Sequence, residues 1–218
     1  HHALVELLTP AVKGWCTDAG IAAADVGIQV HGGMGYIEET GAAQHLRDAR
    51  IAAIYEGTNG IQALDLAGRK VGRDAARSAL ALIGEIAGLR PELAGRAGQP
   101  DFGPIAVHFE AAIAAFESAT RWIAATWNRD AALVAAGATA YLRLFGTVVG
   151  GWLVIRAALA AQALLEKGGD ARFPPSFLGG KIVCAKYFAE QDLVLAPALA
   201  RIVSQGGATI AEADLTAF

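Results

Sequence analysis

Residues 105–127 read IAVHFEAAIAAFESATRWIAATW, a stretch in which apolar side chains return at the spacing of one helix face. Val107, Ile113, Phe116 and Ile123 belong to this repeat. A half-buried strand would alternate apolar and polar residues instead, and no such alternation of any length occurs in the chain. The sequence therefore predicts an all-α fold.

Capping and turn residues divide the rest of the chain into helices. Thr9 before Pro10 predicts a helix start, with Thr9 as the N-cap and Pro10 in the first turn. Thr40 and Asp130 are the expected caps of two later helices, and Pro197 is the expected kink of the last one. Residues 90–104, rich in glycine and proline, are expected to form a loop. The predicted helices cover residues 10–31, 40–50, 58–70 with a continuation toward 87, 105–127, 131–167 and 177–204.

Composition and charge narrow the classes of function. The chain has 218 residues, of which 54% are hydrophobic and 18% charged, a balance typical of a helix-rich, well-buried protein. The net charge is −3, and residues 71–218 carry thirteen basic and thirteen acidic side chains. No basic surface is indicated, so we expect no nucleic-acid partner. The two cysteines lie far apart and fit no metal spacing, which predicts no metal site and favours a reducing compartment, the cytoplasm.

Residues 131–155 form the one stretch that is long and apolar enough to suggest a membrane span. Arg143 lies near its middle, and glycines such as Gly146 and Gly150, together with many alanines, keep its apolar surface small. We therefore favour a buried helix of a bundle over a membrane span or a membrane-surface role.

Two short motifs carry the chemistry. The first is Gln29-Val30-His31-Gly32-Gly33-Met34-Gly35-Tyr36, whose glycines suit a close approach of the backbone to a cofactor phosphate or sugar. The second is Ile54-Tyr55-Glu56-Gly57-Thr58, which places a carboxylate at a helix entrance that Thr58 can cap. A carboxylate in this setting suits a base that removes a proton from carbon.

These motifs, with Leu46-Arg47-Asp48-Ala49-Arg50 between them and Ile61-Gln62 after them, resemble the C-terminal helical domain of acyl-CoA dehydrogenases in order and spacing. The resemblance covers roughly residues 4–70, and three separate motifs make it specific. Residues 59–66 and the helices beyond them look most similar to the branch that includes 3-methylmercaptopropionyl-CoA dehydrogenases. We expect residues 1–70 to be the end of the catalytic helical domain, and residues 71–218 to be an additional α-helical domain, a four-helix bundle-like extension.

The resemblance implies that Glu56 is the catalytic base. In this family the carboxylate takes the α-proton of an acyl-CoA while a hydride leaves the β-carbon for a flavin, which gives a trans-2-enoyl-CoA. The thioester carbonyl then needs hydrogen-bond donors for the charge that develops on it, and the main-chain N–H of Glu56 is implied as one of them. Gly57 matches a substrate-binding position where the thioester passes close to the backbone, although an ordinary turn would also favour glycine there.

FAD is the implied cofactor. Thr58 matches a flavin-contacting position, and the same hydroxyl would also suit a plain N-cap. Many family members carry a glutamine at the position of Gly60 that reaches the flavin. Gly60 has no side chain to do so, and Asn59 or Gln62 are the candidates to replace that contact.

The glycine-rich motif is implied to serve a neighbouring subunit. It matches the family segment that touches the ADP part of a flavin held largely by the other subunit, although a helix end would also favour its glycines. The resemblance therefore implies a homo-oligomer with shared flavin sites. The residues concerned are Gln29, Val30, His31, Gly32 and Gly33.

We expect the chain to be the C-terminal part of an FAD-dependent acyl-CoA dehydrogenase that is inactive alone, because the resemblance places most of the flavin and acyl-CoA sites in earlier domains. An acyl-CoA is the implied substrate, and an electron-transfer flavoprotein is the implied acceptor. One alternative is a flavoprotein relative that binds DNA, which the balanced charge of residues 71–218 disfavours. Another is that the extension serves oligomerisation or a membrane surface. His1 and His2 are either native or the remnant of a tag.

Overall fold

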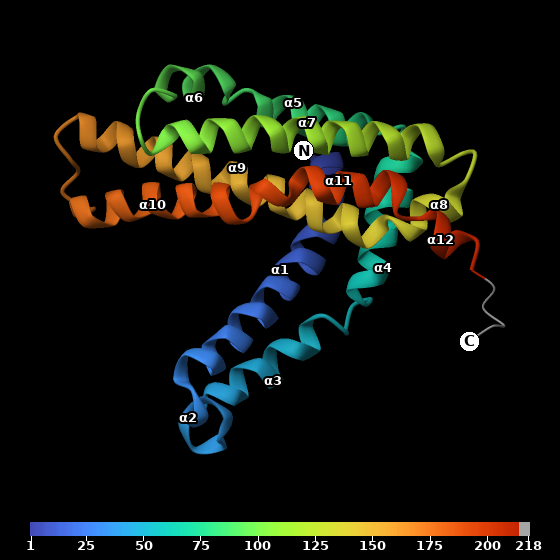
Figure 1. Cartoon of the computed structure of the whole chain (residues 1–218), viewed down its shortest axis with the longest axis horizontal. Helices are drawn as coiled ribbons and strands as arrows, with labels where there is room; N and C mark the ends of the chain where they lie inside the picture. Colours follow the sequence, from blue (N-terminus) through green and yellow to red (C-terminus); the bar gives the residue numbers. More distant parts are fainter. Residues whose placement is uncertain (214–218) are drawn as a thin grey trace.

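The computed structural model describes residues 1–213, and every regular element in this part of the chain is a helix. A long helical bundle forms most of the molecule, and a pair of helices projects from it as an arm (Figure 1). The all-α prediction is confirmed. The arm and the segment that leads back to the bundle contain α1 (His2–His31), α2 (Gly33–Tyr36), the 3-10 turn η1 (Glu38–Thr40), α3 (Ala42–Ala52) and α4 (Asn59–Leu64).

The bundle follows directly from α4. Its long helices lie side by side, with shorter helices at their ends (Figure 1). Its elements are the π-helix η2 (Asp65–Gly72), α5 (Arg77–Ala87), α6 (Arg90–Arg96), α7 (Phe102–Thr126), α8 (Ala131–Ala136), α9 (Ala138–Glu166), α10 (Pro175–Gln191), the 3-10 turn η3 (Leu193–Leu195), α11 (Ala196–Gln205) and α12 (Ala208–Ala211).

Helix α9 is at the centre of the bundle and contacts α7, α10 and α11 as well as α1 and α4. Its length and composition would allow it to cross a membrane, as would those of the region Pro175–Ile210. In this structure α9 supplies side chains to the core. Phe116, Tyr141 and Phe145 form a buried aromatic cluster, with the rings of Phe116 and Phe145 edge to face at 5.3 Å. Burial raises the pKa of the Tyr141 hydroxyl, which shares a hydrogen bond of 2.8 Å with Thr120.

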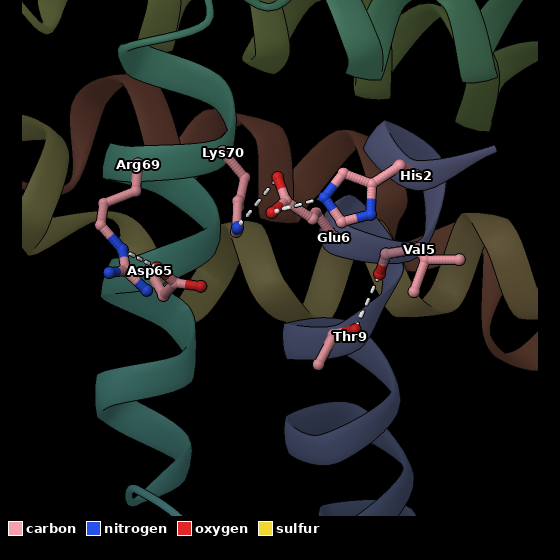
Figure 2. A network of polar contacts seen from close by, with 7 residues as sticks. All are labelled: His2, Val5, Glu6, Thr9, Asp65, Arg69 and Lys70. Carbon is pink, nitrogen blue, oxygen red and sulfur yellow. Dashed lines mark hydrogen bonds and ion pairs between the residues drawn. The ribbon is translucent and has the colours of Figure 1, made fainter.

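The first half of α1 belongs to the same core as the bundle. Leu7 and Ala11 are buried in it, and Trp15 lies against Gly146 of α9, where no side chain would fit. Polar contacts add to this junction, since Lys70 of η2 lies 3.5 Å from Glu6 (Figure 2). The N-terminal half of α1 therefore anchors the arm in the bundle.

The predicted start of the first helix is wrong. Helix α1 begins at His2, so that Pro10 lies inside it, and Thr9 donates to the carbonyl of Val5 at 2.7 Å instead of acting as a cap (Figure 2). The residues before Pro10 are helical because Leu7 is buried against the bundle, and this packing offsets the missing proline N–H. The expected end of the helix at His31 is confirmed.

Thr40 does not cap the second helix. Its hydroxyl donates to the carbonyl of Met34 at 2.5 Å and so closes the turn before α3, which begins after Gly41. Thr58 and Asp130 do cap the helices predicted for them, by accepting hydrogen bonds from the N–H groups of Ile61 and Leu133.

Three further boundaries differ from the prediction because helices meet other helices there. Residues 90–96 form α6 instead of a loop. The stretch 131–167 is divided at Gly137, where a Cβ would lie 2.8 Å from the carbonyl oxygen of Val203 on α11. The last long helix is interrupted at η3, so that Pro197 lies in the first turn of α11, where its missing N–H costs nothing, and does not kink a helix interior.

Candidate functional site

The proposed base lies in the connection between α3 and α4. Ile54 and Tyr55 close the end of α3 through hydrogen bonds to the carbonyl of Ile51. The N–H of Asn59 bonds to the carbonyl of Ala53 at 3.2 Å, which draws the start of α4 back toward the end of α3. Glu56 and Gly57 therefore lie on a tight turn between α3 and α4, at the end of the arm that joins the bundle.

Both residues of this turn have left-handed backbone conformations. Glu56 has a φ of 56° and Gly57 a φ of 83°. Gly57 adopts this conformation freely, and a Cβ there would press on the Gln62 amide at 3.3 Å. Glu56 carries a Cβ, so its left-handed conformation destabilises the fold by about 1–3 kcal/mol. Strain of this kind is concentrated at functional sites in proteins. Ala75 and Ala76 share this conformation, and Glu56 is the one of the three that carries an ionisable side chain.

Side-chain donors hold both carbonyl groups of the turn. Gln62 of α4 donates to the Glu56 carbonyl at 3.0 Å, and Lys13 of α1 donates to the Gly57 carbonyl at 2.5 Å. The N–H groups of Glu56 and Gly57 donate to no residue that the structure describes. The turn therefore presents a carboxylate and free N–H donors from a backbone that is fixed on its carbonyl side.

Asn59 links this turn to α1. Its side-chain amide nitrogen donates to the carbonyl of Gly14 at 3.1 Å, to Thr17 at 2.9 Å and to Asp18 at 2.6 Å. Its amide oxygen accepts from Lys13 at 2.9 Å. The side chain is thus engaged by α1, and a contact from Asn59 to a flavin stays a prediction.

A cleft of about 590 Å³ lies beside the start of α4, between α1, α9 and η3. Asn59 and Gly60 line it, and a Cβ on Gly60 would meet only the Thr58 hydroxyl, at 3.9 Å. Arg143 of α9 and Asp192 also line the cleft. Burial raises the pKa of the Asp192 carboxyl, and the charge of Arg143 opposes this rise. The volume and the open position at Gly60 fit part of a dinucleotide such as FAD.

The glycine-rich motif lies at the far tip of the arm, away from Glu56 (Figure 1). Gln29 to His31 end α1, and Gly32, with a φ of 61°, turns the chain into α2. Lys13 touches the Glu56 turn, and Gln29 is 16 residues further along α1, which amounts to about 24 Å of helix. One chain therefore does not bring the two motifs together. Val30 is 78% exposed at this tip.

Sequence reasoning missed Lys13, Thr17 and Asp18. They lie within two turns of α1, but nothing in the sequence connects that helix with Asn59, more than forty residues later. The only signal was a polar face, Lys13 to Thr17 at i, i+4, on a largely apolar helix, and such a face is usually just solvated. Within the described residues, no three histidine, cysteine or carboxylate side chains are grouped to hold a metal.

Comparison with known proteins divides the chain near the π-helix. The family model described as "Acyl-CoA dehydrogenase, C-terminal domain" matches residues 1–71. A second, "Acetyl-CoA dehydrogenase C-terminal like", matches residues 79–214.

Individual relatives agree with these matches. A 3-methylmercaptopropionyl-CoA dehydrogenase of Ruegeria pomeroyi is 44% identical over 97% of this chain, and a broad-specificity linear acyl-CoA dehydrogenase of Mycobacterium tuberculosis is 30% identical over 98%. The human mitochondrial short-chain specific acyl-CoA dehydrogenase is 52% identical over 52 residues, 24% of this chain and 13% of its own length. The chain spans 35% of the length of each of the first two relatives. The chain belongs to the acyl-CoA dehydrogenase family and corresponds to a C-terminal part of its longer relatives.

Proposed function

We propose that this chain is the C-terminal part of an enzyme that dehydrogenates an acyl-CoA to the trans-2-enoyl-CoA, with Glu56 as the base that removes the α-proton. The observation that carries the proposal is the left-handed Glu56-Gly57 turn, whose carbonyl groups are held by Gln62 and Lys13. A carboxylate on a strained turn whose backbone is held in this way, in a chain of the acyl-CoA dehydrogenase family, supports its assignment as the base.

Different residues of the chain have different roles at the thioester. The Glu56 carboxylate accepts the α-proton, and the free Glu56 N–H donates to the thioester oxygen as negative charge develops there. Gly57 lets the substrate lie against the backbone because it has no Cβ. The alkene forms as the α C–H pair of electrons becomes the new π bond and a hydride leaves the β-carbon.

FAD, when bound, supplies the acceptor for that hydride. On this chain we assign Thr58 and Gly60 to the flavin side of the Glu56 turn, next to the cleft at the start of α4. We assign Gln29, Val30, His31, Gly32 and Gly33 to the flavin of a neighbouring subunit, because they lie at the far tip of the arm. A homo-oligomer, an electron-transfer flavoprotein as the electron acceptor and a cytoplasmic location belong to the same proposal.

The test uses the full-length, FAD-loaded protein. A panel of acyl-CoA thioesters of different chain length and branching is assayed for enoyl-CoA formation with a dye as electron acceptor. Glu56→Gln is then measured on the best substrate. We expect kcat to fall about 10²–10⁴-fold, because glutamine keeps the size of the side chain but cannot accept a proton.

Glu39→Gln is the matched control, since Glu39 is an exposed glutamate of the arm outside the turn. It should leave kcat unchanged. Full activity of Glu56→Gln, or no enoyl-CoA product from any thioester with the unmodified protein, would contradict the proposed function.

A further inference from the structure

The conformation of Glu56 does not persist on its own. A left-handed φ is unfavourable for any residue with a Cβ, so a free turn would relax toward the right-handed region. Relaxation would swing the carboxylate and the Glu56 N–H away from their present directions together, because both are fixed by the same backbone. Contacts from outside the turn must therefore hold it.

The contact that comes from furthest away in the sequence is made by Lys13. Its ammonium group donates to the Gly57 carbonyl at 2.5 Å and to the Asn59 side chain at 2.9 Å. A hydrogen bond from a charged donor is about twice as strong as a neutral one. Lys13 thus ties both ends of the segment 57–59 to α1 with a single side chain.

Lys13 is itself held in place. Helix α1 is anchored in the bundle core through Leu7 and Ala11, six and two residues before Lys13. The Asn59 amide, which accepts from Lys13, is fixed by Thr17 and Asp18 of the same helix. A rigid element therefore supports the donor, as precise positioning of a reacting group requires.

We infer that Lys13 is a positioning residue for the base: it holds the Glu56-Gly57 turn in its left-handed conformation and thereby aims the Glu56 carboxylate and N–H at the substrate. This inference rests on the function proposed above. Lys13 acts through the Gly57 carbonyl and takes no part in proton transfer. Its loss should impair the chemical step more than substrate binding, because a small misplacement of a base costs much of its rate.

The experiment compares variants of the full-length, FAD-loaded enzyme. Lys13→Met removes the donor but keeps an unbranched side chain, Lys13→Arg keeps a charged donor, and Lys70→Met is the control, a lysine of η2 that pairs with Glu6 outside the turn. We measure kcat, KM, bound FAD per chain and melting temperature. Exchange of the α-protons into D₂O is also followed, with an acyl-CoA that carries sulfur at the β-position and has no hydride to lose.

We expect Lys13→Met to lower kcat and the α-proton exchange rate about 10–100-fold, with KM changed less than about threefold. FAD content and melting temperature should stay close to those of the unmodified enzyme. Lys13→Arg should recover most of the rate, and Lys70→Met should equal the unmodified enzyme. If Lys13→Met gives no soluble holoenzyme, Lys13→Gln carries the same comparison.

Unchanged kcat and exchange in Lys13→Met would overturn the inference. The inference would also be overturned if the fall in kcat were matched by a fall in bound FAD and in melting temperature, since that pattern indicates a structural role only. Failure of the proposed function looks different, because Glu56→Gln would then keep its activity. If Glu56→Gln is inactive and Lys13→Met is fully active, the inference about Lys13 is wrong and the proposed role of Glu56 stands.

Discussion

At the residue scale, Glu56 combines an unfavourable backbone with the position of the proposed base. Its φ of 56° makes it one of the few non-glycine residues with a positive φ in the described part of the chain. Glycine would adopt this conformation at lower cost, and under the proposed function the carboxylate at this position serves proton transfer.

This view predicts the effect of substitutions on stability. In the 218-residue chain, Glu56→Gly should unfold with a free energy about 1 kcal/mol higher than Glu56→Ala, because alanine keeps the Cβ that clashes in the left-handed region. Urea unfolding followed by circular dichroism measures the difference. Glu85, exposed on α5, is the control, and there glycine should be about 1 kcal/mol less stable than alanine. Equal stability of the two Glu56 variants would show that the turn is not strained.

At the element scale, glycines set how closely the helices approach. Gly68 and Gly72 of the π-helix lie against Trp127, and a Cβ on Gly72 would come within 2.6 Å of its ring. Gly146 has the same relation to Trp15 at the junction of α1 and α9. Tryptophan rings thus occupy space that is open only because the facing residue has no side chain.

Gly146→Ala should therefore lower the free energy of unfolding by about 1–3 kcal/mol, the usual result of overpacking a core. Gly84 on α5 is the matched position, since it is helical and exposed and a Cβ there meets nothing within 4 Å. Gly84→Ala should raise stability by about 1 kcal/mol through helix propensity. Denaturant unfolding of both variants is the measurement. A Gly146→Ala chain as stable as the unmodified one would mean that Trp15 moves aside without cost.

At the scale of the whole molecule, a hydrogen-bonded ion pair closes one end of the bundle. Arg96 of α6 donates to Glu166 at the end of α9 at 2.7 and 3.2 Å, and Gln162 adds a bond of 3.0 Å. The hydrogen bond from Arg96 is the main reason why the pKa of Glu166 falls from 4.5 to about 2. A carboxylate with a lowered pKa stabilises the fold at higher pH, and this contribution fades as the pH falls through that range.

Glu166→Gln should therefore be less stable than the unmodified chain at neutral pH, and the difference should shrink between about pH 4.5 and about pH 2. Urea unfolding at several pH values measures it. The same substitution in an Arg96→Met background, which lacks the hydrogen bonds from Arg96 to Glu166, should show a smaller trend. A stability difference that stays constant with pH would contradict the assignment to the Arg96 pair.

The same scale shows how the molecule meets its surroundings. Large apolar side chains are exposed on the arm and around the Glu56 turn, while the bundle buries most of its own. We expect this surface to be covered by other protein, in agreement with the proposed oligomer. The residues include Val26, Val30, Met34, Tyr36, Ile54, Tyr55 and Ile61.

Local chemistry was enough to predict the all-α class, the caps Thr58 and Asp130, the end of α1 and the turn at Glu56, because helical spacing, capping groups and glycines act over a few residues. It failed at Thr9, at Gly137 and at η3. Those boundaries depend on contacts between distant segments, such as the packing of Leu7 in the bundle core and the approach of the Val203 carbonyl to Gly137. The role of Lys13 was hidden for the same reason, since its partner Gly57 is 44 residues away. Short-range propensities in the sequence thus specify which segments are helical, and the resemblance of its motifs to a known family points to Glu56 as the proposed base. Packing between distant helices decides where those helices break and what holds the Glu56 turn in place.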